Sequence, residues 1–133
     1  MYNVLPTCIL AITAVPSSPG APEILAVGKD FATIEWLKPE SDGGSPLTSY
    51  LIESREKKSI RWVKVNRDSV LLDTSFKISG LQERNIYQFR ITAINAAGDS
   101  LPSELSMYAV CRVATCKYLL TYQSSCTRTE QLS

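Results

Sequence analysis

Four cysteines are the residues with the clearest potential for chemistry in this chain of 133 residues. Thiolates can bind a metal ion, pair as disulfides or act as nucleophiles. The sequence contains no histidine, the commonest protein ligand for metals. Three cysteines lie near the C-terminal end, at spacings unlike the close pairs of zinc sites, and one lies near the N-terminus: Cys111, Cys116, Cys126 and Cys8. We therefore expect free thiols, no metal site and no cofactor.

The same composition argues against an enzyme. Without histidine the chain lacks the usual general base. It also lacks paired carboxylates in an apolar setting, a nucleophile elbow and a phosphate-binding loop. The glycine-containing stretches "DGGSP" and "AAGDS" do not precede a helical pattern, as a phosphate loop would. We predict a protein without catalytic activity.

A cluster of basic residues is the strongest candidate for a binding surface. Its members are six cations and one tryptophan, opposed within the segment only by Glu56: Arg55, Lys57, Lys58, Arg61, Lys64 and Arg67, with Trp62. A cationic surface can meet an acidic protein surface and speed association. The alternative is a solvated hairpin whose charges protect an edge strand from pairing with another sheet.

Charge and hydropathy bear on other partners. The net charge of +1 gives no argument for binding to nucleic acid or membranes. The apolar run at residues 4–15 is shorter than the roughly 20 residues that a membrane span needs. It could be a cleaved signal peptide, but no lysine or arginine precedes it and Pro6 interrupts it. We expect residues 1–16 to be a tail or linker, and the signal peptide stays an alternative.

The basic residues and Trp62 must be positioned by short β-strands, which the sequence pattern predicts. Apolar and polar residues alternate along the middle of the chain, as they do in half-buried strands, and clusters of turn-forming residues separate the runs. We predict strands at residues 23–27, 31–37, 48–56, 61–66, 75–79, 85–95 and 104–110. Seven short strands without a helical pattern predict an all-β fold, an antiparallel Greek-key sandwich of the immunoglobulin-like type.

The alternation also predicts the core and one turn. Trp36, Tyr50, Tyr87 and Phe89 fall on the inward faces of the predicted strands. The stretch "PESDGGSP", residues 39–46, should let the chain cross from one sheet to the other. Its two glycines can adopt positive φ without steric cost, and its second proline cannot donate to a strand ladder.

Residues 17–110 resemble a fibronectin type III domain. The resemblance is carried by "PGAP" before the first strand, by Trp36, by "YLIE" in the third strand and by "GLQERNIYQFRITAINAAGDSLPSE". Leu81 and Tyr87 match the leucine and the corner tyrosine of the family. The resemblance implies that both contribute to the core, and that the tyrosine hydroxyl bonds to backbone a few residues upstream.

A narrower resemblance concerns the loop "PESDGGSPLTSY". It is similar to the corresponding loop in type III domains of intracellular muscle proteins, such as titin and the myosin-binding proteins C and H. This implies a monomeric structural or protein-interaction module of a sarcomeric or cytoskeletal filament-associated protein, located in the cytoplasm at the myofibril. Myosin or another filament component would be its partner.

Besides the sarcomeric module, the sequence leaves one alternative function and one expectation about the C-terminal residues. The alternative function is an extracellular adhesion or receptor fragment, secreted after cleavage of the signal peptide. Residues 111–133 carry no domain pattern and, like residues 1–16, are expected to form a poorly ordered tail.

Overall fold

The computed structural model describes residues 13–113, and its regular elements are all β-strands. In chain order they are β1 (Glu23–Val27), β2 (Phe31–Glu35), β3 (Leu47–Glu56), β4 (Val63–Lys64), β5 (Ser75–Ser79), β6 (Ile86–Asn95), β7 (Gly98–Asp99) and β8 (Ala109–Val110). All pairings are antiparallel. The predicted all-β, antiparallel sandwich is confirmed.

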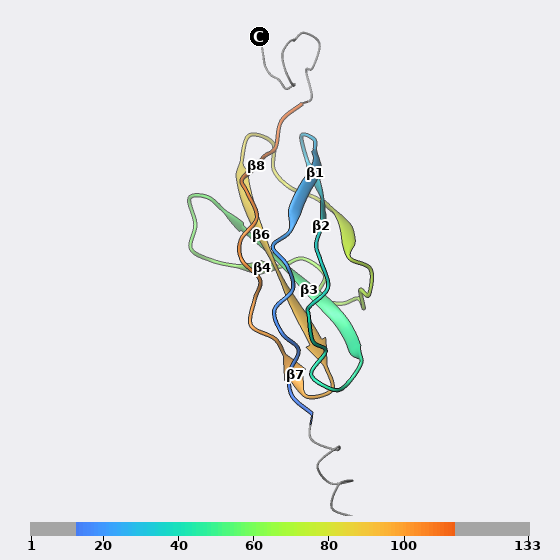
Figure 1. The fold of residues 1–133 in the computed structure, drawn as a ribbon. Helices are drawn as coiled ribbons and strands as arrows, with labels where there is room; N and C mark the ends of the chain where they lie inside the picture. Colours follow the sequence, from blue (N-terminus) through green and yellow to red (C-terminus); the bar gives the residue numbers. More distant parts are fainter. Residues whose placement is uncertain (1–12, 114–133) are drawn as a thin grey trace, which may run out of the picture.

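Two sheets form the sandwich. One contains β1, β2 and β5 in the order β1-β2-β5, and the other follows β4-β3-β6-β7, with β8 also paired to β6. The longest pairing joins β3 to β6, from Leu47 opposite Asn95 to Glu56 opposite Tyr87. The described part of the chain begins at one end of the sandwich, near β7, and leaves at the opposite end, near β8 (Figure 1).

The core lies between the sheets and contains the aromatic residues named above. Trp36, Tyr50, Tyr87 and Phe89 are buried, and Leu81 is half-buried and packs against them. Trp36 and Tyr50 meet edge to face, with ring centroids 5.4 Å apart. The N–H of Gln82 donates to the hydroxyl of Tyr87 at 3.0 Å, which is the corner geometry that the resemblance implies.

The last predicted strand differs from the structure. Instead of one strand at residues 104–110, the chain beside β6 forms two short strands, β7 and β8, joined by a segment in which every third residue is a serine. Each serine donates its N–H to a β6 carbonyl and accepts the N–H of the same β6 residue through Oγ. The distances are 2.8–3.0 Å, and the pairs are Ser100 with Ala93, Ser103 with Ile91 and Ser106 with Phe89.

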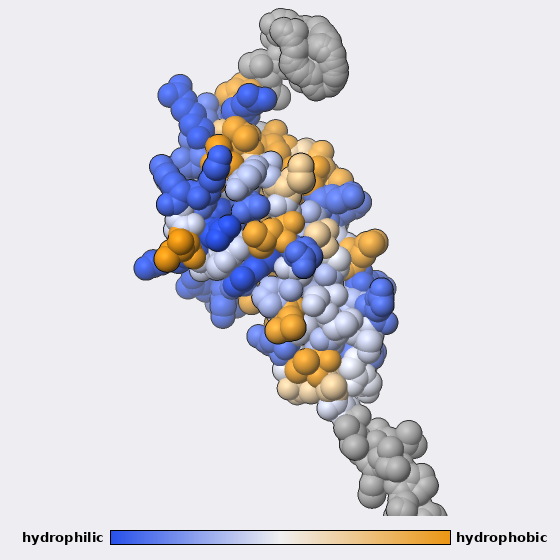
Figure 2. Space-filling model, turned by 60° about the vertical axis from the view of Figure 1, so that its left-hand side comes forward, coloured by the Kyte–Doolittle hydropathy of each residue, from blue (hydrophilic) through white to orange (hydrophobic). Residues whose placement is uncertain are grey.

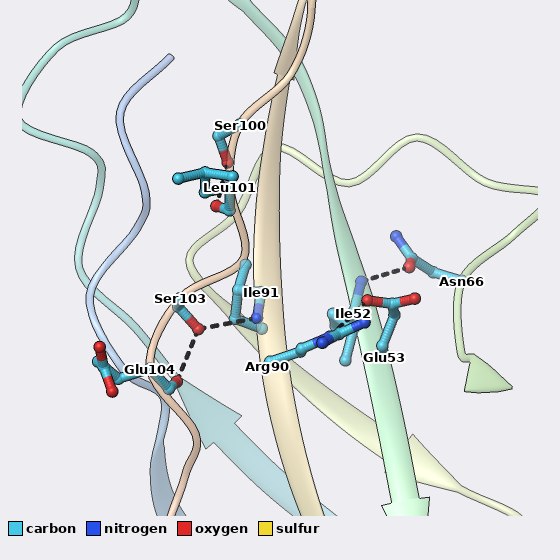
Figure 3. A network of polar contacts seen from close by, with 9 residues as sticks. All are labelled: Ile52, Glu53, Asn66, Arg90, Ile91, Ser100, Leu101, Ser103 and Glu104. Carbon is cyan, nitrogen blue, oxygen red and sulfur yellow. Dashed lines mark hydrogen bonds and ion pairs between the residues drawn. The ribbon is translucent and has the colours of Figure 1, made fainter. Parts of the chain in front are cut away.

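The serine hydroxyls explain why a regular strand is not needed there. Each one supplies the acceptor that a strand carbonyl would otherwise provide, so three residues of this segment pair with two of β6. Ser103 Oγ also donates to the carbonyl of Glu104 at 2.9 Å, which holds the hydroxyl in place (Figure 3). A repeat of three is that of a polyproline II helix and not of a β-strand.

The first residue of the expected C-terminal tail packs in the core of the sandwich. Cys111 was expected to begin this tail, but its side chain is completely buried in the core, and its N–H donates to the carbonyl of Asn85 at 3.0 Å. Burial, with a smaller contribution from the charge of Asp30, raises the pKa of its thiol. Residues 1–12 and 114–133, with Cys8, Cys116 and Cys126, lie outside the described residues.

Candidate protein-binding surface

The basic cluster lies on and around the hairpin that joins β3 to β4. The connecting loop projects to the side of the sandwich, at the left of Figure 1. Strand β4 contains only Val63 and Lys64, which makes it shorter than the predicted strand at residues 61–66. Val63 pairs with buried Ser54, whereas Lys64 pairs with Glu53. Because paired residues share a face, Lys64 lies on the same face as Glu53, and Val63 lies on the opposite face with Ser54.

Trp62 is half-buried, and its ring contacts two guanidinium groups from the larger sheet. The guanidinium carbon of Arg90 is 4.2 Å from the centre of the indole ring, and that of Arg55 is 4.8 Å from it. Such contacts are attractive because the ring face is electronegative. Two strands thereby fix the tryptophan, which in turn fixes the hairpin against β6.

Polar contacts hold the two arginines in this position. Nε of Arg90 is 2.8 Å from Oε1 of Glu53 (Figure 3). Nη2 of Arg55 donates to Oε1 of Gln88 at 3.0 Å, and Gln88 donates to the carbonyl of Ser106 at 3.1 Å. The sequence analysis did not include Glu53, Gln88 or Arg90 in the site. The sequence signal that could have identified them is their position on the outward face of β3 and β6, next to the basic cluster.

The remaining cations of the cluster lie in more than one place around the hairpin. Nζ of Lys57 lies 5.1 Å from the centre of the Tyr108 ring. Arg61 borders a hollow of about 470 Å³ at the open side of the sandwich, together with Val63 and Ile78. Lys58 and Arg67 are exposed. The seven predicted residues therefore surround the hairpin, and the structure does not join them into one flat patch.

The loop at residues 39–46 has a separate role at the N-terminal end of the sandwich. Gly43 has a φ of 76°, and a Cβ atom there would lie 2.0 Å from the carbonyl oxygen of Ala14. Ala14 donates its N–H to the carbonyl of Gly43 at 2.8 Å. Ser17 and Ser41 exchange three further hydrogen bonds. The loop thus holds the segment that leads into β1.

Asn95 ties a third segment to this contact. Its side-chain amide donates to the carbonyl of Ala14 at 2.8 Å and to that of Asp42 at 2.7 Å. Its Oδ1 accepts the N–H of Ala97 at 2.8 Å and that of Gly98 at 3.1 Å. One buried side chain therefore joins the leading segment, the glycine loop and the β6–β7 turn.

The chemistry available to these surfaces is recognition by charge and shape. In the described part of the chain no group of three or more cysteine or carboxylate side chains is placed to hold a metal ion. Nor does this part contain a helix with the length and apolar character needed to cross a membrane. The structure offers a rigid sandwich with exposed cations and a braced tryptophan.

Comparison with known proteins gives the family. The profile of the fibronectin type III domain matches residues 17–107. Chicken cardiac-type myosin-binding protein C is 39% identical over 92 residues, 69% of this chain and 7% of the relative. The mouse fast-type protein is 40% identical over 94 residues, 71% of this chain and 8% of the relative. The chain thus spans less than a tenth of these proteins.

A solved structure adds the same information at the level of the fold. A titin module from human cardiac muscle superimposes with a TM-score of 0.65 and 42% sequence identity. The match covers 71% of this chain and 91% of the titin module. The similarity therefore covers one domain of this chain and nearly all of the titin module.

Proposed function

The chain belongs to the fibronectin type III family, of the kind found in muscle proteins, and from this we propose that it is a protein-interaction module of a sarcomeric filament-associated protein. The similarity to myosin-binding protein C over the whole domain carries the proposal. A module of this kind acts by presenting a rigid surface, and it performs no chemistry. The relatives named above are muscle proteins, which favours this proposal over an extracellular receptor fragment.

The proposed partner is myosin or another component of the filament, and the proposed location is the cytoplasm at the myofibril. The name of the relatives supports a myosin partner. The exposed lysines and arginines of the hairpin support contact with an acidic surface, because opposite charges steer association. The brace formed by Trp62, Arg55 and Arg90 fixes the hairpin before binding, which lowers the entropy lost on association.

Co-sedimentation with purified myofibrils tests the proposal directly. The full chain should sediment with myofibrils at low ionic strength and be released as salt increases, since surface charges are screened over about 10 Å at 0.1 M salt. A fluorescent fusion in striated muscle cells should show periodic bands. Absence of both sedimentation and bands, with a folded protein, would refute the proposed function.

A further inference from the structure

The C-terminal end of the sandwich brings together three segments that are distant in sequence. Lys57, just after β3, donates its N–H to the carbonyl of Ile86 at 2.8 Å. Cys111, just after β8, donates to the carbonyl of Asn85 at 3.0 Å and accepts the N–H of Arg84. Backbone hydrogen bonds therefore fix the hairpin, the turn before β6 and the departing chain relative to one another.

A hollow of about 320 Å³ opens where the first two segments meet. Its surface is mainly apolar, and it is bordered by Glu56, Lys57, Lys58, Arg84, Asn85 and Ile86. The three cations are exposed. Within residues 13–113 the ion pair formed is Arg90–Glu53, so none of these cations is paired with a described carboxylate. Outside the hollow, the exposed ring of Tyr108 lies beside Lys57.

Arg84 occupies an unfavourable backbone conformation at this place. Its φ is 75°, and among the described residues it is the one non-glycine residue with positive φ. An L-residue with a Cβ atom is strained there, whereas glycine is not. Strained residues of this kind cluster at functional sites, so the strain supports a hypothesis of function for this residue. The strained residue, Arg84, carries the third cation of the hollow.

We propose that the hollow at Lys57, Lys58 and Arg84 is a docking site for an acidic peptide segment of the partner protein that also carries apolar side chains. Three cations against one carboxylate, Glu56, select an acidic segment by charge. The mainly apolar surface of the hollow, to which Ile86 contributes, can accept an apolar side chain between the acidic ones. Figure 2 shows hydrophilic and hydrophobic residues side by side at the upper end of the molecule, where the chain leaves.

This inference rests on the proposed interaction function and makes it more specific. The earlier set of basic residues included Arg61, Lys64 and Arg67, which lie away from this hollow. It did not include Arg84, which comes from a segment outside the hairpin. The docking site therefore combines part of the hairpin with a residue that sequence spacing did not connect to it.

Binding of a probe peptide to the full chain tests the site. The probe is a short peptide of repeated Glu-Glu-Leu triplets, and a Glu-Glu-Ser peptide of equal charge is its control. In isotope-labelled protein, the Glu-Glu-Leu peptide should shift the amide resonances of Lys57, Arg84 and Ile86, and the control should bind about threefold or more weakly. Shifts confined to other faces, or equal binding of both peptides, would overturn the proposal.

Substitution of Arg84 gives the sharpest result, because strain and charge predict opposite changes. Arg84→Gly should raise Tm by about 4 °C and weaken peptide binding about threefold to tenfold. Arg67→Gly removes an equal charge from an exposed loop and should leave binding within about twofold. Arg84→Gly with a raised Tm and unchanged binding would show that the arginine does not contribute, and the site would be rejected.

Two further outcomes separate this inference from the proposed function. If the Arg84→Gly chain binds the peptide weakly, but the wild-type chain neither sediments with myofibrils nor forms periodic bands in muscle cells, the site stands and the sarcomeric function fails. If Arg84→Gly binds the peptide and sediments with myofibrils as wild type does, the function stands and the site fails. Amide shifts at Lys57 and Arg84 on concentrating the protein alone would identify a second copy as the occupant and contradict an acidic partner.

Discussion

The two ends of the sandwich each contain a residue in the left-handed backbone region, and the two residues differ in type. At the N-terminal end Gly43 has a φ of 76°, and at the C-terminal end Arg84 has a φ of 75°. Around Gly43 the space is filled, since an added Cβ atom would lie 2.0 Å from the Ala14 carbonyl oxygen. Arg84 is exposed, so nothing of this kind restricts its side chain.

This difference separates a structural glycine from a residue retained for its side chain. At Gly43 both the backbone conformation and the neighbouring segment require the absence of a side chain. At Arg84 the backbone conformation alone would favour glycine, yet a long cationic side chain is present beside two lysines. Both ends hold a segment of chain through hydrogen bonds, and the proposed docking site distinguishes the C-terminal end from the N-terminal end.

The largest effect is expected from Gly43→Ala. The added methyl group meets the Ala14 carbonyl in a backbone region that alanine disfavours, so the free energy of unfolding should fall by about 2–4 kcal/mol. Urea denaturation followed by tryptophan fluorescence measures this change. Gly80→Ala is the matched control, because Gly80 has a similar φ of 77° but no atoms within 4 Å of an added Cβ. If Gly80→Ala lost as much free energy of unfolding as Gly43→Ala, the cost would come from the backbone conformation and not from the contact with Ala14.

Asn95→Ala should have the next largest effect. It removes four hydrogen bonds at once and leaves the carbonyls of Ala14 and Asp42 without this donor. We expect a loss of about 2–3 kcal/mol in the free energy of unfolding. Hydrogen exchange should also become faster at the amides of Ala14 and Gly98. Unchanged exchange at Ala14 would mean that the leading segment is held without Asn95.

Arg84→Gly should change stability by a smaller amount and in the opposite direction. Relief of the left-handed strain should raise the free energy of unfolding by about 1 kcal/mol. Equilibrium denaturation of the two chains under identical conditions measures the difference. A variant less stable than the parent would show that the side chain of Arg84 supports the fold, and the contrast between the two ends would be lost.

High pH should produce the smallest of these effects, with one titrating group near each end. Burial raises the pKa of Tyr50, beside the glycine loop, and burial with the charge of Asp30 raises the pKa of Cys111. The unfolded chain therefore loses these protons at lower pH than the folded chain does. The free energy of unfolding should be unaffected below about pH 8 and decrease as pH rises through the raised pKa values.

Denaturation of Cys111→Ala at several pH values separates the two contributions. The variant should lose part of the alkaline decrease and keep the part that Tyr50 causes. The same decrease in the parent and the variant would show that the thiol does not titrate in this range. The thiol should also resist alkylation in the folded chain, because Cys111 is completely buried.

Much of the fold was predictable from the sequence because its signals are local. Strict alternation over residues such as Tyr87, Phe89 and Ile91 places one face of β6 in the core, and all three side chains are buried. Turn-forming residues separate the strands where the chain reverses. Burial of alternate side chains dominates the free energy of a sandwich, so the pattern that records it is strong.

The binding surface was predictable only in part. The basic character of the hairpin follows from composition, but the stacking of Trp62 on Arg90 depends on how β6 and the hairpin are placed across β3. Arg84 lies 17 positions beyond Arg67 in the sequence, and nothing in the spacing connects it to Lys57 and Lys58. The sequence pattern therefore predicted the basic hairpin as the binding region, but it did not predict which residues meet there.

By itself the sequence determined the alternation, the turns and the aromatic core, since each depends on residues close together in the chain. The tertiary structure alone decided three other features: the pairing of the serine segment with β6, the burial of Cys111 and the strain at Arg84. Each of these depends on a partner that is distant in sequence. The serines meet donors that β6 offers at its edge, the thiol fills space between two sheets, and the turn at Arg84 is fixed by the carbonyl of Cys111.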